Sequence, residues 1–555
     1  MVSHAFRRVG IRAERYAGVA NMGAIRFSRR QALRQGGTGL AAGALATAGI
    51  ANVRAQDAAT PVADDLTAAI EAILDDPRFL PSRLGVYVAD RATGEAVYSY
   101  HADEWFLAAS TTKVFAGSAA LDVIGADHRF ETPVYRTGEI GADGTLEGDL
   151  ILVAVGDPTM GGRDTSDGTI AYTALDHIYA NGFPTLAELT PQDPLDGLND
   201  PATQIAAAGI SQINGDVIID DRLFPTTPKD DYLLSPVWIN DNLIDFTLTP
   251  GESGAATTLA WRPMTAALQV ENQVTIGAAG DDPAVDVSSP EPGKILLTGT
   301  IPADIAQAVF TFQIEDPSSF ARILLIEALE TAGVTVTAKP TGANPVDVLP
   351  VSGSYAPANQ VAVHQSLPFG ENLKLIFKVS HNQHADQIVY LMAVANGSTD
   401  FSDGMAEIGA FLKRTGIDPA SVSLGDGRGN LYTDVFSPRT VSELLIKMAA
   451  RPDADVFDAA MPILGVDGSE TNTVPATSPV AGKAAAKSGT TVDFDVMNQR
   501  IVMMTRALAG YMTGSSGREY AFGIYLNNVP LVEFNDVLEM IAVHGSIAEA
   551  IYEHV

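Results

Sequence analysis

The stretch LAASTTKVFAGSAAL, residues 107–121, holds one charged residue, Lys113, in a run of apolar and small residues. On a helix Lys113 lies one turn after Ser110, so the two side chains share a face. Burial of an unpaired ammonium is costly. The simplest interpretation is that the lysine stem packs while its amine reaches solvent. The alternative is that Lys113 is a base held beside a nucleophilic serine, and the rest of the chain must decide between the two.

Two more short motifs lie further along the chain, first SxN and then K-[ST]-G. SHN (380–382) is the one SxN sequence in the chain, and KSG (487–489), followed by Thr490, is the one K-[ST]-G sequence. Each triplet alone arises readily by chance. Together with a single SxxK motif, Ser110 to Lys113, they indicate a serine enzyme that works through an acyl-enzyme.

Length and composition restrict the class of protein. With 555 residues, 46% of them hydrophobic, the chain can form two or three domains with at least one large core. A formal net charge of -32 argues against a nucleic-acid partner, because phosphate binding needs clustered Lys and Arg. The chain has no cysteine, which excludes disulfides, thiolate catalysis and thiolate zinc sites.

The N-terminal segment, residues 1–55, differs from the rest. It contains nine arginines and one acidic residue, Glu14. The pair Arg29-Arg30 precedes an uncharged Ala/Gly-rich run, 35–53, which is the layout of a secretory signal peptide of the twin-arginine type. A retained membrane anchor is the alternative, although the run is weakly hydrophobic for a span. We therefore expect an exported protein, periplasmic, extracellular or cell-wall-associated, without a stable membrane span after cleavage.

The remaining chain divides into segments with different hydrophobic patterns and turn-residue content. After a linker, 56–65, residues 66–135 contain a helical stretch, a hairpin signal over 83–103 and the Ser110 helix. Residues 136–345 are rich in short strands and Gly, Pro and Asp turns. Helical patterns return over 373–394 and 440–450, followed by a strand pair near 506–528 and a closing helix near 534–552. The pattern predicts an α/β (α+β) domain split by a long β-rich insertion.

The chain resembles the penicillin-binding D-alanyl-D-alanine carboxypeptidases and endopeptidases of the low-molecular-mass class C group. The three motifs carry the resemblance, and a long insertion between the first and second motifs is typical of that group. Secondary matches are EGDLILVAVGDPTM (147–160), NGDVIIDDRLF (214–224), GDGRG (425–429) with SPRT (437–440), and ALAGYM (507–512) leading to YLNN (525–528). The resemblance implies a serine beta-lactamase/transpeptidase-like fold, an antiparallel sheet with flanking helices, over roughly residues 65–550.

The resemblance also implies a division of labour. Ser110 would be the nucleophile on peptidoglycan stem peptides and on beta-lactams, and Lys113 its base, provided that burial and the charge of Lys487 lower the lysine pKa. Ser380 would relay a proton to the leaving amine, and Asn382 would orient the substrate amide. The substrate would bind along the third motif, where Lys487 and Thr490 hold its carboxylate and Ser488 and Gly489 belong to the same strand. No cofactor is expected.

Three positions depart from the family pattern or are ambiguous. Arg428 stands in the 426–429 turn, where it either shapes a substrate pocket or is a solvated turn residue. Residues 491–504 make the hairpin after Thr490 longer than expected. Asp157 would lie near the pocket for the peptide side chain by resemblance, but an Asp-Pro turn residue is the more economical interpretation.

Other functions remain open. His381, His384 and Asp386 raise the question of a metal site, but no HExxH and no convincing third ligand accompany them, so we expect no metal. A Ser-His-Asp hydrolase is disfavoured because the chain has no GxSxG elbow. The alternatives to a carboxypeptidase are a non-catalytic peptidoglycan-binding or beta-lactam-sensing protein, and a beta-lactamase-like hydrolase or esterase.

Overall fold

The computed structural model describes residues 61–230, 232–251, 256–532 and 536–555. The predicted signal peptide, residues 1–55, and residues 56–60 of the predicted linker lie outside these residues. In the described part of the chain, no helix is long and apolar enough to cross a membrane.

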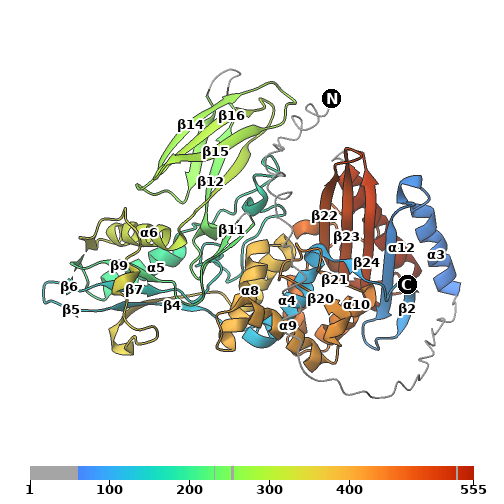
Figure 1. Cartoon of the computed structure of the whole chain (residues 1–555), viewed down its shortest axis with the longest axis horizontal. Coiled ribbons are helices and arrows are strands. Elements are labelled where there is room, and N and C mark those ends of the chain that lie inside the picture. Colours follow the sequence, from blue (N-terminus) through green and yellow to red (C-terminus); the bar gives the residue numbers. More distant parts are fainter. Residues whose placement is uncertain (1–60, 231, 252–255, 533–535) are drawn as a thin grey trace, which may run out of the picture. The chain divides into compact units, whose positions relative to one another are not determined.

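A five-stranded antiparallel sheet is built from both ends of the described chain (Figure 1). Its order is β2-β1-β24-β23-β22, so β22 is an outermost strand. The strands are β1 (Arg83–Asp90), β2 (Ala96–Tyr100), β22 (Ala484–Asp495), β23 (Arg500–Thr513) and β24 (Glu519–Leu531). The hairpin predicted over 83–103 and the strand pair predicted near 506–528 are both confirmed.

Alternating side chains give this sheet two buried faces, because successive residues of a strand point to opposite sides. On β23, Ala507, Ala509 and Tyr511 belong to one hydrophobic core. Leu508 and Met512 belong to another. Both faces of the sheet are therefore covered, in contrast to an antiparallel sheet with one face in water.

Helices supply the covering layers (Figure 1). The core that contains Leu508 is completed by residues of α3 (Pro61–Ile73) and α12 (Asp536–His554). The core that contains Ala507 is completed by one helix from the early part of the chain and five from its later part: α4 (Thr112–Ile124), α7 (Phe369–Lys374), α8 (Asn382–Ala395), α9 (Phe401–Thr415), α10 (Pro438–Ala449) and α11 (Ala454–Ala460). The predicted antiparallel sheet with flanking helices is confirmed.

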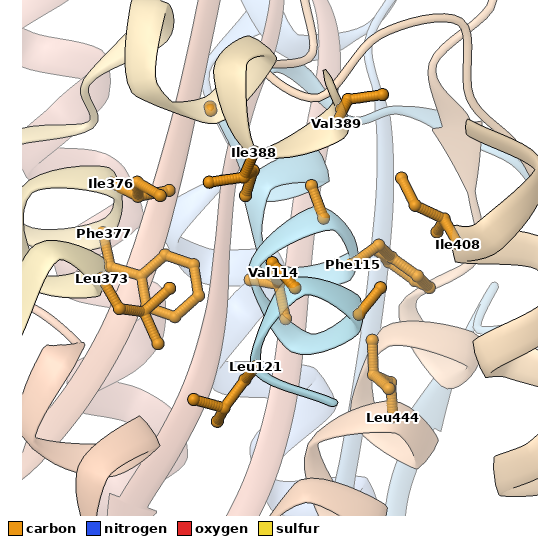
Figure 2. Close-up of a cluster of buried hydrophobic side chains, with 14 of the residues drawn as sticks. Val114, Phe115, Leu121, Leu373, Ile376, Phe377, Ile388, Val389, Ile408 and Leu444 are labelled. Atoms are coloured by element: carbon orange, nitrogen blue, oxygen red, sulfur yellow. The ribbon is translucent and has the colours of Figure 1, made fainter. Parts of the chain in front are cut away.

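Helix α4 is the central element of its core, and its residues from Thr112 to Leu121 are all buried. A helix that is apolar or small on every side is typical of the interior of a large domain. Figure 2 shows Val114, Phe115 and Leu121 of α4 surrounded by apolar side chains from several other segments. A Cβ on Gly117 would lie 2.6 Å from the ring of Phe377, so a glycine permits this close packing.

A small sheet sets the backbone just before α4. It has the order β20-β21-β3, with β3 (Phe106–Leu107), β20 (Val422–Ser423) and β21 (Val435–Phe436). Leu107 pairs with Val435, so the chain that enters the SxxK segment is bonded to the strand that follows the GDGRG turn. This pairing brings two sequence motifs together that are more than 300 residues apart.

The long insertion is built mainly of small sheets, as predicted. The first contains β19 (Gln360–Gln365), β4 (Glu131–Arg136), β7 (Leu150–Val153) and β9 (Val217–Asp220), and the second β18 (Thr335–Val336), β8 (Gln212–Ile213), β6 (Thr145–Glu147) and β5 (Glu139–Ile140). Two three-stranded sheets contain β13 (Thr258–Arg262), β12 (Leu243–Thr249) and β17 (Ala308–Gln313), and β14 (Gln269–Ile276), β16 (Lys294–Ile301) and β15 (Ala284–Glu291). A hairpin of β10 (Thr227–Lys229) and β11 (Tyr232–Leu234) completes the set.

The insertion also contains two helices that the sequence pattern did not indicate, α5 (Asp196–Ala207) and α6 (Pro317–Thr331). Helix α6 begins with a standard signal, since the Asp316 side chain accepts a hydrogen bond from the Ser319 N–H and Pro317 occupies the first turn. Strands β4 and β19, on either side of the predicted 136–345 segment, pair with each other. The domain limits themselves stay a prediction.

The packing of α4 gives the first testable prediction. We expect Gly117→Ala to lower the free energy of unfolding by about 1–3 kcal/mol, because the new methyl group overpacks against Phe377. Gly409→Ala in α9 is the matched control, since a Cβ there meets nothing within 4 Å. That control should be neutral or stabilising by up to about 1 kcal/mol through helix propensity. Chemical denaturation measures both, and equal effects at the two sites would contradict the packing argument.

Candidate active site

The SxxK serine lies on a strained turn that leads into α4. Ser110 is the middle residue of a 3-10 turn, Ala109–Thr111, and Ala109 before it has a φ of 45°, a left-handed value that costs a non-glycine residue energy. Gly429 of the GDGRG turn packs against it so closely that a Cβ would lie 1.8 Å from the Ala109 carbonyl oxygen. The left-handed Ala109 backbone and the close contact with Gly429 therefore fix the turn that carries Ser110.

Lys113 is fully buried, which rules out the interpretation that its amine reaches solvent. Its Nζ lies 2.9 Å from Ser110 Oγ, 2.7 Å from Asn382 Oδ1 and 2.9 Å from the Arg428 carbonyl oxygen. Two of these partners can only accept hydrogen bonds, whereas a serine hydroxyl can also donate. A neutral amine satisfies all three, because it donates its two hydrogens to Asn382 and Arg428 and its lone pair accepts the Ser110 proton.

The electrostatics of the site favour that neutral amine. Burial lowers the pKa of Lys113 well below its usual value, and the charge of Lys487 acts in the same direction. Asp426 and Asp386 oppose this shift, but among the described residues no carboxylate pairs with the amine. Lys113 can therefore serve as a base near neutral pH.

The SxN motif interrupts the helix that the sequence predicts over 373–394. Helix α7 continues as a π-helical turn, Leu375–Val379, and Ser380 ends it with a left-handed φ of 65°. Helix α8 then begins at Asn382, and His381 is its N-cap. This break points the Asn382 side chain back to Lys113, and π-helical turns of this kind are frequent at functional sites.

The K-S-G motif lies on the outermost strand β22 beside the serine. Gly489 contacts the Ser110 turn, where a Cβ would be 2.9 Å from the Ser110 nitrogen and 2.6 Å from the Ala108 carbonyl oxygen. Lys487 is fully buried, and its Nζ donates to the Ser488 carbonyl oxygen at 2.6 Å. Burial lowers the pKa of Lys487 to about 7; Glu470 opposes the shift and Arg506 adds to it. In this motif region only Thr490 is exposed.

Arg428 is placed away from solvent rather than in a solvated turn. Its guanidinium pairs with Asp230 after β10 and lies 3.3 Å from Asp386, and it stacks over the Tyr232 ring at 5.1 Å. The backbone carbonyl of the same residue binds Lys113. The Arg428 side chain thus connects the insertion, through Asp230, to the turn whose carbonyl oxygen binds Lys113. A role of Arg428 in a substrate pocket stays a prediction.

Asp157 occupies the turn that its Asp-Pro sequence suggests. Its Oδ1 accepts hydrogen bonds from the backbone N–H groups of Thr159 at 3.0 Å and Met160 at 3.1 Å. Its Oδ2 lies 3.4 Å from His364 Nε2. These contacts account for its burial, and its place near a peptide side-chain pocket stays a prediction.

The geometry so far joins Ser110, Lys113 and Asn382 directly and sets the K-S-G strand against them. A sequence profile of the D-Ala-D-Ala carboxypeptidase 3 (S13) family matches residues 66–545. The chain belongs to this family. The prediction of a serine-type D-Ala-D-Ala carboxypeptidase is confirmed at this level.

Individual relatives of this S13 member cover most of its length. It is 29% identical over 483 residues to a D-alanyl-D-alanine carboxypeptidase of Actinomadura sp. (strain R39), a match that spans 82% of this chain and 80% of the relative. It is 24% identical to D-alanyl-D-alanine carboxypeptidase DacB of Haemophilus influenzae, over 80% of this chain and 85% of the relative. The crystal structure of penicillin binding protein 4 (dacB) from Haemophilus influenzae has the same fold, with a TM-score of 0.63, 20% identity, and coverage of 89% of this chain and 100% of that one.

In this S13 protein the insertion supports the SxN motif through residues that sequence reasoning missed. The Tyr179 hydroxyl donates to the Ser380 carbonyl oxygen at 2.6 Å. Asp241 accepts a hydrogen bond from His384 Nε2 at 2.8 Å and pairs on its other oxygen with Arg163 at 2.8 Å. A sequence signal for this cluster is the run Asn240-Asp241-Asn242, because Asn and Asp tolerate a left-handed backbone best. In the structure all three residues have left-handed φ values of 53–55°.

The same cluster contains the two histidines that raised the question of a metal site. Asp386 does not face the histidines, because its oxygens accept hydrogen bonds from the Gly427 N–H and the Tyr232 hydroxyl, both at 2.9 Å. Asp241 does face them, with His381 Nε2 at 3.3 Å and His384 Nε2 at 2.8 Å. The two imidazoles, however, are stacked at 3.7 Å with planes inclined by 19°. Both histidines thus direct Nε2 to the Asp241 carboxylate.

A second set, Asp176, His177 and Asp241, already contains a fixed cation. Arg163 donates to Asp176 at 2.6 Å and to Asp241 at 2.8 Å. Burial would lower the pKa of His177, but Asp245 and Asp176 outweigh it and raise that pKa to about 10, whereas burial and the neighbouring His384 lower the pKa of His381 to about 3. The arrangement is a buried network of charge-assisted hydrogen bonds, and the absence of a metal stays a prediction.

The contact between Tyr179 and Ser380 gives the second prediction. Tyr179→Phe removes the hydrogen bond that holds Ser380 in its left-handed conformation, so we expect kcat on a D-Ala-D-Ala peptide to fall about tenfold, equivalent to about 1.4 kcal/mol. The control is Tyr98→Phe, whose hydroxyl pairs with Thr67 at the opposite side of the sheet. Equal kcat for both variants, with matching melting temperatures, would contradict a role for the insertion in placing the SxN motif.

Proposed function

We propose that this S13 protein removes the terminal D-Ala from peptidoglycan stem peptides through an acyl-enzyme on Ser110. The observation that carries the proposal is the fully buried Lys113 amine, 2.9 Å from Ser110 Oγ and held by two partners that only accept hydrogen bonds. Such an amine accepts the serine proton as the hydroxyl attacks. A sensor without turnover would have no need of a neutral base for the second, hydrolytic step.

Acylation uses the three motifs together. Ser110 Oγ attacks the carbonyl carbon of the penultimate D-Ala while Lys113 takes its proton. The backbone N–H groups of Ser110 and Thr490 receive the developing oxyanion, which is consistent with the close approach of Gly489 to the Ser110 nitrogen. The C–N bond then breaks as Ser380 passes its hydroxyl proton to the leaving D-Ala amine and receives the proton that Lys113 took from Ser110. In the second step Lys113 takes a proton from water as the water oxygen attacks the ester carbonyl. The ester C–O bond then breaks, Lys113 returns the proton to Ser110 Oγ, and the peptide acid leaves.

Substrate binding follows from the third motif. Strand β22 is outermost in its sheet, so an extended peptide can lie along it, with Ser488 and Gly489 as backbone partners. Asn382 orients the substrate amide. Lys487 and Thr490 hold the terminal carboxylate. A beta-lactam carries an equivalent carboxylate and a strained amide, and we infer that it acylates the same serine. The structure of penicillin binding protein 4 from Haemophilus influenzae complexed with a novel beta-lactam supports this by analogy.

The location follows from the substrate and from the N-terminal sequence. Peptidoglycan lies outside the cytoplasmic membrane, so the enzyme must be exported. We propose that residues 1–55 direct this export, with Arg29-Arg30 as the twin-arginine pair. The absence of cysteine is compatible with an exported protein whose stability depends on its cores.

A labelled penicillin tests the nucleophile directly. We expect wild type to be labelled covalently and to release D-Ala from a D-Ala-D-Ala peptide, while Ser110→Ala loses both properties and keeps the wild-type melting temperature. Ser118→Ala, on the buried part of α4, is the control serine. Labelling of wild type without peptide turnover would support the sensor, rapid release of the label would support a beta-lactamase, and no labelling would overturn the proposal.

The pKa of Lys487 predicts a pH dependence. Its cationic form binds the carboxylate, so binding is complete below pH 7 and is lost as pH rises through about 7. We expect the second-order acylation constant of a penicillin to fall above that pH. The second-order acylation constant of the penicillin methyl ester, which has no carboxylate, should not fall over this pH range. A descent of equal size for acid and ester would contradict the assignment of carboxylate binding to Lys487.

A further inference from the structure

Arg506 lies directly behind the one exposed residue of the third motif. It stands opposite Thr490 in the register of β22 and β23, and its Nη1 donates to Thr490 Oγ1 at 2.9 Å. Its Nη2 lies 3.2 Å from Glu470 Oε2 and 3.3 Å from Thr473 Oγ1. The guanidinium thus links Thr490, in the proposed carboxylate site, to the buried Glu470.

This arginine is not explained by stability. Its side chain is 4% exposed, and within the described residues its Nε has no hydrogen-bond partner. Removal of a charged group from water costs several kcal/mol, which one incompletely bonded ion pair rarely recovers. Sites that break the rules of stable packing in this way are where function is expected.

The contact with Thr490 decides what the hydroxyl can do. A hydroxyl has one hydrogen to donate and two lone pairs that accept. Because Arg506 occupies a lone pair of Oγ1, the hydroxyl hydrogen is directed to another acceptor. Thr490 is exposed and directly follows Gly489, which packs against the Ser110 turn. The available direction is therefore toward solvent beside that turn, where a substrate carboxylate is an ideal acceptor.

The charges around Arg506 lead to the same ligand. Arg506 and, below pH about 7, the protonated Lys487 are two cations that interact with one carboxylate, Glu470. His544, the other titratable group that interacts with Arg506, is neutral because burial lowers its pKa to about 3. An anion that enters beside Thr490 therefore compensates a surplus positive charge.

We propose that Arg506 is a positioning residue that turns the Thr490 hydroxyl into a dedicated donor for the substrate carboxylate and thereby sets the preference of this enzyme for substrates with a free carboxyl terminus. The proposal rests on the proposed function, since it assumes acylation of Ser110. Arg506 acts through Thr490 and does not itself touch the substrate. The long hairpin that precedes it, residues 491–504, carries β23 to the register in which Arg506 and Thr490 meet.

The test compares a penicillin with its methyl ester on purified full-length protein. The readout is the ratio of the two second-order acylation constants, measured by mass spectrometry of the covalent adduct. Wild type should prefer the acid strongly. We expect Arg506→Gln to lower this ratio about tenfold or more, the size expected for loss of a hydrogen bond to a charged group. Arg506→Lys should restore part of it.

Two more variants separate positioning from general damage. Thr490→Val should lower the ratio as Arg506→Gln does, and the double variant should lose no more than Thr490→Val alone. Arg500→Gln, whose side chain pairs with Asp495 near the start of the same strand, should leave the ratio unchanged. Melting temperatures exclude unfolded variants.

The outcomes are distinct. Equal loss of acid and ester acylation in Arg506→Gln, or an unchanged ratio, would overturn the positioning role while leaving the nucleophile assignment intact. Additive losses in the double variant would overturn the route through Thr490. If wild type were acylated by neither compound, the proposed function and this inference would both fail.

Discussion

The site depends on the burial of the Lys113 amine, with which no carboxylate pairs in the part of the chain that the structure describes. A buried cation would be expensive, and burial lowers the pKa of the amine well below its usual value, which favours the neutral form. Each contact of the amine fixes another part of the site: Ser110 one turn earlier, Asn382 at the start of α8, and the Arg428 carbonyl in the GDGRG turn. Three segments that are far apart in the sequence meet at one nitrogen atom.

The insertion takes part in this arrangement. Tyr179 bonds the Ser380 carbonyl, Asp241 bonds His384 beneath the SxN motif, and Asp230 pairs with Arg428. These contacts join the insertion to two of the three segments that surround Lys113. The cost of the left-handed turn at Asn240 to Asn242 is thus offset by a network that holds the second motif in place.

Much of the fold and site could be predicted because the signals were local. Strands β1, β2, β23 and β24 alternate or are bounded by turn residues, and the motifs Ser110 to Lys113, SHN (380–382) and KSG (487–489) have fixed short spacings. The break of the helix at Ser380 and the helices α5 and α6 were missed, since tertiary contacts and caps outweighed the residue pattern. Arg506 and Asp241 carry no motif, and only their neighbours in space give them meaning.

The sequence by itself determined which residues can do chemistry: one serine with a lysine a helical turn away, one SxN and one K-S-G, in an order that few other enzymes share. Tertiary structure alone decided the protonation state of Lys113, because that depends on the exclusion of water and on the charges of Lys487, Asp426 and Asp386, none of which is near it in the chain. The sequence pattern specifies which residue types are present. The pKa of Lys113 and the direction of the Thr490 hydroxyl depend on surroundings that exist only after folding.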